Sequence, residues 1–220
     1  MNLLDKAYNN NLNFVIALDG PGASGKGRIA HLLAEEFALI YVASGIVYRG
    51  LAYICLQENI CAEDEQAIIE LSRNVDLISR TKGVDLNLEI IGEFASKLSI
   101  LPEVRRNLGI YLKKLIQITP RIIMEGRDVG TIIAPNADLK IFITASVEVR
   151  AMRRYKQLRD AGKDCILSDV LDLLKSRDER DMSRSVAPLI PASDAYIIDT
   201  TNLTIDQAIQ RIKDIVSKSS

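Results

Sequence analysis

The stretch Gly20-Pro-Gly-Ala-Ser-Gly-Lys-Gly27 lies between an apolar run, Asn13–Leu18, and a run of helical character, Arg28–Phe37. This order predicts a strand, a glycine-rich loop and a helix. Glycines let backbone N–H groups turn inward around a polyphosphate, the helix N-terminus adds partial positive charge, and Lys26 adds a full one. The loop therefore indicates a nucleoside triphosphate as ligand. The alternative is a glycine loop that binds no phosphate.

Apolar runs elsewhere in the chain predict the rest of a parallel sheet that is buried on both faces. Strands that alternate with helices in this way are typical of an α/β fold, whose ligands bind at the carboxyl ends of the strands. We expect the polar residues Asp19 and Glu125–Asp128 at that edge. The predicted strands are Phe14–Leu18, Leu39–Val42, Arg121–Glu125, Lys140–Thr144 and Tyr196–Asp199. The predicted helices are Arg28–Phe37, Gly45–Leu56, Pro102–Ile118, Val147–Ala161, Ser168–Asp181 and Thr204–Lys218, and the last opens with a capping-box pattern.

Two segments depart from this alternation. Val75–Arg80 and Val84–Ile90 each alternate apolar with polar residues, and Lys82-Gly83 lies between them. This pattern predicts an antiparallel β-hairpin inserted in the α/β core, either as surface decoration or as a cover for a substrate. Residues 1–12 are expected to form a frayed N-terminal tail.

Composition limits the class of protein. A chain of 220 residues can form one α/β domain with an insertion, and the net charge of −1 argues against a general nucleic-acid binder. No apolar run is as long as a membrane span, and the N-terminus does not read as a signal peptide, so we expect a cytoplasmic protein without membrane partners. Cys55, Cys61 and Cys165 have no metal or redox spacing. His31, the single histidine, is interpreted as structural, which argues against a Ser-His-Asp triad or a histidine metal site.

Arginines cluster where phosphate recognition needs them. Arg49 and Arg127 follow predicted strands, while Arg150, Arg153 and Arg154 share one helix face, as do Arg177, Arg180, Asp181 and Arg184. Arginine's planar fork suits phosphate, and phosphoryl transfer needs several cations around the moving group. The alternative for each arginine is an ordinary surface salt bridge with Glu148, Asp178 or Glu179. For Arg153 and Arg180 the two interpretations stay equally open.

Together these segments resemble the bacterial cytidylate kinases, a branch of the nucleoside monophosphate kinases. The resemblance runs in order from about residue 13 to the C-terminus. It rests on Ile16–Gly27, Ser44-Gly45 with Tyr48-Arg49, Gly126–Thr131, Lys140–Phe142, Arg177–Asp181 and Arg184–Leu189. It implies a three-layer P-loop NTPase fold with a five-stranded parallel sheet, a small β-hairpin insert at 62–100 that binds the nucleoside monophosphate, and a helical lid at 150–163. All of these belong to a single kinase domain, 1–220.

The resemblance also implies an activity and a set of site residues. The activity is transfer of the γ-phosphoryl group of ATP to CMP or dCMP, in a monomer, with Mg²⁺ held by the ATP phosphates and water. Lys26, Arg127, Arg150, Arg154 and Arg184 would be catalytic, with Arg150 and Arg154 as lid arginines. ATP would contact Gly20, Pro21, Gly22, Ala23, Ser24, Gly25, Lys26, Gly27 and Arg28. Ser44, Arg49, Arg127 and Arg184 would hold the CMP phosphate, Ser96, Arg105 and Asp128 would read cytosine, and Arg177 and Asp181 would contact ribose.

Four features depart from the family pattern. Ala43 and Glu125 stand where aspartate is usual, and Arg28 stands where threonine is usual. The segment between Ile90 and Ser96 is shorter than in most members, so the insert is expected to lack a strand. A glycine after the loop lysine, here Gly27, is normal in this class.

Two other functions remain open on the sequence alone. One is a kinase of the same fold that acts on UMP, AMP or a sugar-like acid, since fold does not fix the substrate. The other is an ATP-binding regulator or switch without kinase activity. A GTPase is disfavoured because the chain has neither a Ser/Thr after Lys26 nor an Asn-Lys-x-Asp motif.

Overall fold

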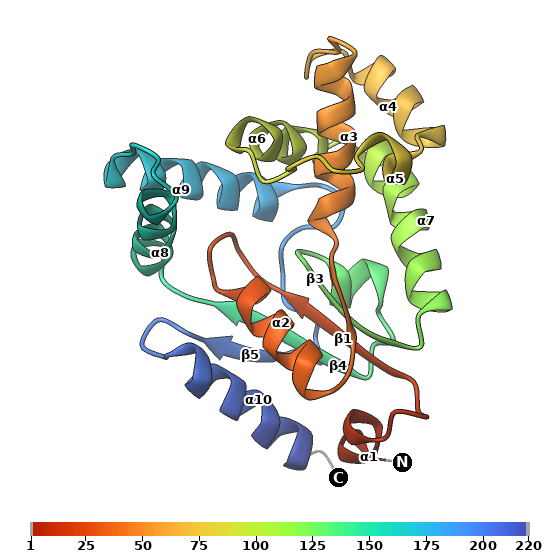
Figure 1. The fold of residues 1–220 in the computed structure, drawn as a ribbon, viewed down its shortest axis with the longest axis vertical. Helices are drawn as coiled ribbons and strands as arrows, with labels where there is room; N and C mark the ends of the chain where they lie inside the picture. The colour runs from red at the N-terminus through yellow and green to blue at the C-terminus, as the bar shows by residue number, and fades with distance from the viewer. Residues whose placement is uncertain (1, 219–220) are drawn as a thin grey trace. The chain divides into compact units, whose positions relative to one another are not determined.

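A computed structural model describes residues 2–218, except the side chain of Ile78 (Figure 1). The chain divides into two compact units. The first contains Met1–Val42 and Ile118–Ser220, and the second is the continuous stretch Ala43–Gln117. The first unit is α/β and carries the predicted sheet, while the second is helical.

The sheet has five strands in the order β2-β3-β1-β4-β5. Central β1 pairs in parallel with β3 and β4, which places Asp19 beside Gly126 and Phe142, and β4 pairs in parallel with β5. The carboxyl ends of the strands therefore lie along one edge. The strands are β1 (Phe14–Asp19), β2 (Ile40–Ala43), β3 (Arg121–Gly126), β4 (Leu139–Thr144) and β5 (Tyr196–Asp199). All five predicted strands are confirmed within one residue at each end.

Aliphatic side chains from alternate positions of the strands form the main core. Ile16, Leu18 and Ile123 lie in one cluster with Leu33 and Ile212, which come from α2 (Lys26–Glu36) and α10 (Ile205–Lys218). The residues between them in the strands, Ala17, Ile122 and Met124, are also fully buried, so both faces of the sheet are covered. This explains the continuous apolar runs of the sequence.

The remaining helices of the first unit follow the predicted ranges closely. They are α8 (Val147–Asp160) and α9 (Leu167–Ser183), and a π-helical turn, Val129–Ile133, follows β3. The capping box of α10 is confirmed, because Thr204 Oγ1 accepts from the N–H of Gln207 while Gln207 Oε1 accepts from the N–H of Thr204.

The N-terminal segment is ordered, so the expected frayed tail is wrong. Residues Leu3–Tyr8 form helix α1, whose first turn is capped by the side chain of Asn2. Lys6 pairs with Asp138, and Ala7 is fully buried. The buried guanidinium of Arg121 fixes the whole segment by donating to the backbone carbonyls of Lys6, Ala7, Asn9, Leu12, Phe37 and Ala38.

We expect Arg121→Ala to lower the free energy of unfolding by about 3 kcal/mol, because it leaves six carbonyls without their charged donor. Urea denaturation measures the change, and protease cleavage within residues 1–12 should accelerate. Arg211→Ala, a change at an exposed position of α10, is the control. A loss below about 1 kcal/mol would mean that the tail docks without Arg121.

The second unit consists of helices, and the predicted hairpin is wrong. Asp76 caps the short helix α5 by accepting from the N–H of Ser79, and Asp85 accepts from the N–H of Asn87. Both aspartates therefore stabilise local turns and do not belong to the solvent-facing side of a strand. The alternating apolar residues Leu77 and Leu86 are buried, and Leu77 lies next to Gly50 of helix α3. A turn does contain Gly83, which has φ 76°. The helices are α3 (Gly45–Gln57), α4 (Glu65–Asn74), α5 (Leu77–Arg80), α6 (Glu89–Leu98) and α7 (Pro102–Ile118).

Candidate active site

The glycine-rich loop connects the carboxyl end of β1 to the N-terminus of α2, as the sequence predicts. Gly20 has φ 147°, and a Cβ at this position would lie 1.9 Å from the carbonyl oxygen of Ile143, so only glycine fits. Lys26 is buried, and its Nζ donates to the carbonyl of Pro21 at 2.9 Å. The lysine thus lies folded back over its own loop.

Burial controls the charge of this lysine. Burial, together with the nearby cations Arg127 and Arg177, lowers the pKa of Lys26 to about 7, although Glu125 and Asp19 act in the opposite direction. Burial also raises the pKa of Asp19 to about 6, against the two backbone N–H bonds that favour its ionised form. A buried cation without a full counter-charge is a good acceptor site for polyanions.

Asp19 links this loop to the segment that follows β3. Its carboxylate accepts from the N–H of Val129 at 2.9 Å and of Gly130 at 2.7 Å. A Cβ on Gly130 would approach that carboxylate at 3.4 Å. The Gly126–Thr131 motif is therefore fixed to the end of β1, as its place at the sheet edge requires.

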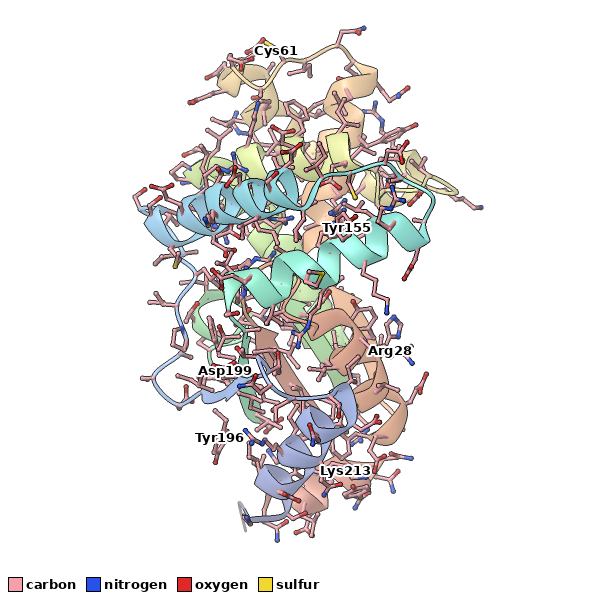
Figure 2. All side chains as sticks on the ribbon, turned by 90° about the vertical axis from the view of Figure 1, so that its left-hand side faces the viewer. Arg28, Cys61, Tyr155, Tyr196, Asp199 and Lys213 are labelled. Carbon is pink, nitrogen blue, oxygen red and sulfur yellow. The ribbon has the colours of Figure 1, made fainter. Side chains whose placement is uncertain are left out.

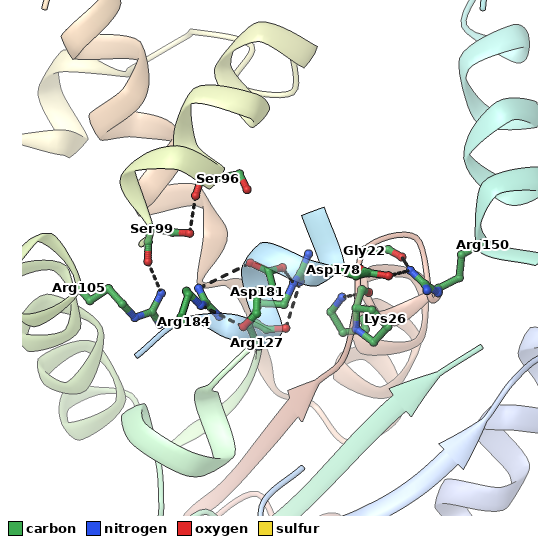
Figure 3. Close-up of polar contacts among 12 residues, drawn as sticks. Gly22, Lys26, Ser96, Ser99, Arg105, Arg127, Arg150, Asp178, Asp181 and Arg184 are labelled. Carbon is green, nitrogen blue, oxygen red and sulfur yellow. Dashed lines mark hydrogen bonds and ion pairs between the residues drawn. The ribbon is translucent and has the colours of Figure 1, made fainter. Parts of the chain in front are cut away.

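A second cluster is built from β3 and α9. Arg127 Nε donates to Asp181 Oδ2 at 2.9 Å, and Arg184 Nη1 lies 3.7 Å from Asp181 Oδ1 (Figure 3). Burial pushes the pKa of Asp181 upward, but Arg127, Arg184 and Arg177 outweigh it and hold that pKa below its usual value. Asp181 thus organises the arginines that the sequence assigns to the acceptor phosphate and ribose.

The two clusters meet at Gly22 of the loop. A Cβ on Gly22 would lie 3.8 Å from Arg127 Nη2 and 3.9 Å from Arg177 Cδ. The loop and the arginine cluster are therefore neighbours at the carboxyl edge of the sheet. Arginines far apart in the sequence converge beside a phosphate-binding loop.

The predicted lid arginines behave differently from each other. Arg150 is buried, pairs with Asp178 Oδ2 at 2.6 Å, and donates to the carbonyls of Ala145 and Gly22 (Figure 3). Arg154 is half-buried, and its Nη1 donates to Gln157 Oε1 at 2.9 Å. Arg150 already lies against the loop, while Arg154 lies on the more open side of α8.

The predicted acceptor residues of the second unit form two local groups. Arg49 Nη1 donates to the carbonyl of Leu86 at 2.7 Å, and a Cβ on Gly92 would lie 2.9 Å from Arg49 Nη2. Arg105 Nη1 donates to the carbonyl of Ser99, and Ser99 Oγ donates to the carbonyl of Ser96.

Three further observations describe the same unit. Arg105 also lies over the ring of Tyr48, at 5.6 Å from its centroid. Ser96 is buried, and its Oγ has no hydrogen-bond partner. Ser44 is buried at the N-terminus of α3, directly after Ala43.

Glu125 faces the loop, whereas Arg28 is exposed. Glu125 accepts from Tyr41 Oη at 2.9 Å, and a Cβ on Gly27 would lie 3.5 Å from Glu125 Oε1. The carboxylate thus faces the position after the loop lysine. Arg28 is exposed on the outer side of α2 (Figure 2). His31 packs its ring against Tyr41 at 4.2 Å between centroids, which supports its structural interpretation.

Residues with no predicted role also contact the site. Asp178 holds Arg150, and Thr200 contacts the loop at Ser24. Thr200 follows β5 directly, so its place at the carboxyl end of a predicted strand was a usable signal. From the sequence, Asp178 was only one of several carboxylates that could pair with an arginine.

The described residues 2–218 contain no group of three or more His, Cys, Asp or Glu side chains that could hold a metal ion. Over the same residues, no helix combines the length and the apolar character needed to cross a bilayer.

We expect ATP binding to take up a proton through Lys26. Its pKa of about 7 in the free protein should rise when phosphates surround the ammonium, so affinity should fall as pH increases from about 7. Calorimetric titration with ATP in two buffers of different ionisation enthalpy measures the proton count. At pH 8 Asp19 does not contribute to the proton count, because its pKa is about 6. No proton uptake at pH 8, or uptake unchanged in Lys26→Met, would contradict the assignment.

A parallel sheet of order 2-3-1-4-5 with this loop after its central strand, bordered by converging arginines, defines a P-loop phosphotransferase. The model of the cytidylate kinase family matches residues 16–218, and the chain belongs to that family. Two curated relatives, both called cytidylate kinase, support this. The protein of Rickettsia bellii (strain OSU 85-389) is 54% identical over 217 residues, covering 99% of each chain. That of Rickettsia canadensis (strain McKiel) is 51% identical over 212 residues, covering 96% of each chain.

Among solved structures, an uncharacterized protein from Eubacterium ventriosum ATCC 27560 is similar with a TM-score of 0.54 at 14% identity. The match covers 93% of this chain and 99% of that one. At this identity the likeness supports the fold alone.

Proposed function

We propose that the chain transfers the γ-phosphoryl group of ATP to CMP or dCMP, giving ADP and CDP or dCDP. The proposal describes a monomeric, cytoplasmic enzyme with no nucleic-acid or membrane partner. The observation that carries it is the approach of Arg127 and Arg177 to Gly22, which brings acceptor-side cations against the donor-phosphate loop. Transfer between two phosphates requires this juxtaposition, whereas a protein that only binds ATP does not.

Each half of the site would bind one nucleotide. The backbone N–H groups of Gly20–Gly27 and the ammonium of Lys26 would hold the ATP phosphates. Arg127 and Arg184, held by Asp181, would bind the acceptor phosphate together with Ser44 and Arg49. A phosphate monoester is already anionic, so no residue has to act as a general base.

The remaining residues would neutralise the moving group and exclude water. Arg150 lies against Gly22 already, and Arg154 would approach the transferred phosphoryl group when the lid at 150–163 closes. Their positive charge would offset the charge that spreads over the equatorial oxygens. Closure would exclude the water that otherwise hydrolyses ATP.

The second unit would supply base recognition. Cytosine presents an amino donor beside the acceptors N3 and O2, whereas uracil has a carbonyl in place of the amino group. Arg105 and Ser96 would donate to the acceptors, and Asp128 would accept from the amino group. The buried hydroxyl of Ser96 without a partner supports this, because a buried hydroxyl usually finds one. Arg177 and Asp181 would contact the ribose.

Magnesium fits the oxygen donors beside the loop. Glu125, steadied by Tyr41, places a carboxylate next to Gly27, and Mg²⁺ prefers such hard oxygen ligands while keeping several waters. Glu125 would therefore hold the ion through its water shell. When bound, the ion supplies screening of the negative charge on the ATP phosphates.

The direct test is to incubate the protein with ATP and Mg²⁺ plus CMP, dCMP, UMP or AMP, and to follow formation of ADP and of the nucleoside diphosphate. Fast turnover with CMP and dCMP only is the expected result. Equal turnover of UMP would remove the proposed roles of Arg105, Ser96 and Asp128. ATP binding without turnover of any acceptor would favour the non-catalytic regulator.

A further inference from the structure

Arg153 of α8 has no role above, although its side chain reaches the phosphate-binding loop. Its Nη1 donates to the carbonyl of Ser24 at 3.3 Å and to Thr200 Oγ1 at 3.1 Å, and its Nη2 donates to the carbonyl of Thr200 at 2.7 Å. One guanidinium thus joins the loop to the turn after β5. A planar fork with several donors in fixed directions suits these three acceptors better than the single nitrogen of a lysine.

Thr200 is itself fixed to the sheet. It is buried, its N–H donates to the carbonyl of Thr144 at 2.8 Å, and its Oγ1 lies 3.0 Å from the same oxygen. Its Oγ1 also lies 3.3 Å from the carbonyl of Ser24. Since Thr144 ends β4, Arg153 holds Ser24 against a rigid part of the molecule.

The loop is strained between the two carbonyls that α8 holds. Ala23 has φ 58°, in the left-handed region that disfavours residues with a Cβ. Arg150 donates to the carbonyl of Gly22, directly before Ala23, and Arg153 donates to the carbonyl of Ser24, directly after it. Two arginines three residues apart on one helix therefore bracket the strained residue.

These contacts set the direction of loop N–H groups. The described peptide bonds are trans, and in a trans peptide the C=O and the following N–H point in opposite directions. Holding the Gly22 carbonyl fixes the N–H of Ala23, and holding the Ser24 carbonyl fixes the N–H of Gly25. Both N–H groups are then turned away from the arginines, which is how a phosphate cradle has to present them.

We propose that Arg153, seated on Thr200, is a positioning residue that holds the Ala23–Gly25 segment of the loop in its strained, phosphate-binding conformation. The inference rests on the proposed use of ATP. It assigns to Arg153 an effect on the donor nucleotide, transmitted by the loop, and none on the acceptor. A purely structural Arg153 would instead tie α8 to β5, and its loss would lower stability without a selective effect on ATP.

The test compares Arg153→Ala, Ala23→Gly and the double variant with the unchanged protein. Calorimetry gives the Kd for ATP, steady-state assays give KM for CMP, and thermal unfolding gives Tm. Arg153→Ala is expected to raise the Kd for ATP about tenfold with KM for CMP unchanged, because a charge-assisted bond that organises the loop is lost. Arg153→Lys should recover little of this loss, since it lacks the fork.

The decisive measurement is the coupling between the two positions. Ala23→Gly alone should raise the Kd for ATP, because glycine loosens a loop whose backbone N–H groups bind the phosphates and which Arg153 already holds in its binding conformation. In the Arg153→Ala background, Ala23→Gly removes the energetic cost of the left-handed backbone conformation. The Kd for ATP should therefore fall about threefold to fivefold relative to Arg153→Ala alone. Arg211→Ala serves as the control for loss of an exposed arginine.

The outcomes separate the inference from the function on which it rests. If Ala23→Gly fails to rescue Arg153→Ala, or if Arg153→Ala leaves the Kd for ATP unchanged, the positioning role is wrong even though the unchanged protein binds ATP. A fall in Tm with equal increases in the Kd for ATP and the KM for CMP would also overturn it. Arg153 would then only tie α8 to β5. Failure of the unchanged protein to bind ATP would remove the proposed function itself.

Discussion

Lys26→Ala is expected to lower kcat about a thousandfold, the largest effect of any single change in the chain. The side chain is buried, donates to the carbonyl of Pro21 and lies near Arg127 and Arg177, so water screens its charge poorly. Its ammonium would therefore act strongly on the ATP phosphates as charge moves between them. A coupled assay of ADP formation at saturating CMP measures the loss.

The same substitution should leave the fold intact. A buried ammonium whose pKa is lowered to about 7 costs folding free energy, so Tm should stay level or rise slightly when the lysine is removed. Lys213→Ala, which breaks a surface pair with Glu36, is the matched control and should keep full activity. If kcat for Lys26→Ala stayed within about threefold of the unchanged protein, the loop would have no part in phosphoryl transfer.

Arg127→Ala is expected to raise KM for CMP about a hundredfold, since one or two charged hydrogen bonds to the acceptor phosphate would be lost. The substitution also removes the 2.9 Å hydrogen bond from Arg127 Nε to Asp181 Oδ2, whereas Arg184 Nη1 lies farther from this carboxylate, at 3.7 Å from Oδ1. Steady-state kinetics with CMP as the varied substrate measure the change.

Arg127→Lys separates charge from geometry. The lysine keeps the positive charge but not the Nε donor that faces Asp181, so most of the loss should remain. Arg73→Ala, which removes an exposed arginine paired with Glu70, is the control. An unchanged KM for CMP in both Arg127 variants would place the acceptor phosphate elsewhere.

The sequence predicts the sheet well because its signal is local and strong. The central strands β1, β3 and β4 are buried on both faces, and their apolar runs are too short for buried helices. The prediction of a hairpin within Val75–Ile90 was wrong because the signal there was weak. The alternation of period two came from aspartates that cap turns and from single buried leucines, and periodicity alone does not separate this pattern from that of a strand.

The candidate site was predictable in its residue types and only partly in its contacts. Lys26, Arg127 and Asp181 follow from motifs, and the structure brings them together within the first unit. The partners of Arg150 and Arg153 did not follow, since helix spacing shows a shared face but not what that face meets. The carbonyls that they hold belong to the backbone, which sequence motifs do not describe.

The insertion of the helical unit between β2 and β3 has a consequence for synthesis. Strand β1 ends at Asp19, but its two neighbours begin at Arg121 and Leu139 and are synthesised more than 100 residues later. At ordinary elongation rates β1 waits about 5–20 s for a partner. Meanwhile the whole of Ala43–Gln117 has emerged and contains only local helices, so it can collapse first. The apolar face of Phe14–Asp19 is exposed during that interval, which makes the nascent chain, rather than the finished protein, the form most in need of a chaperone.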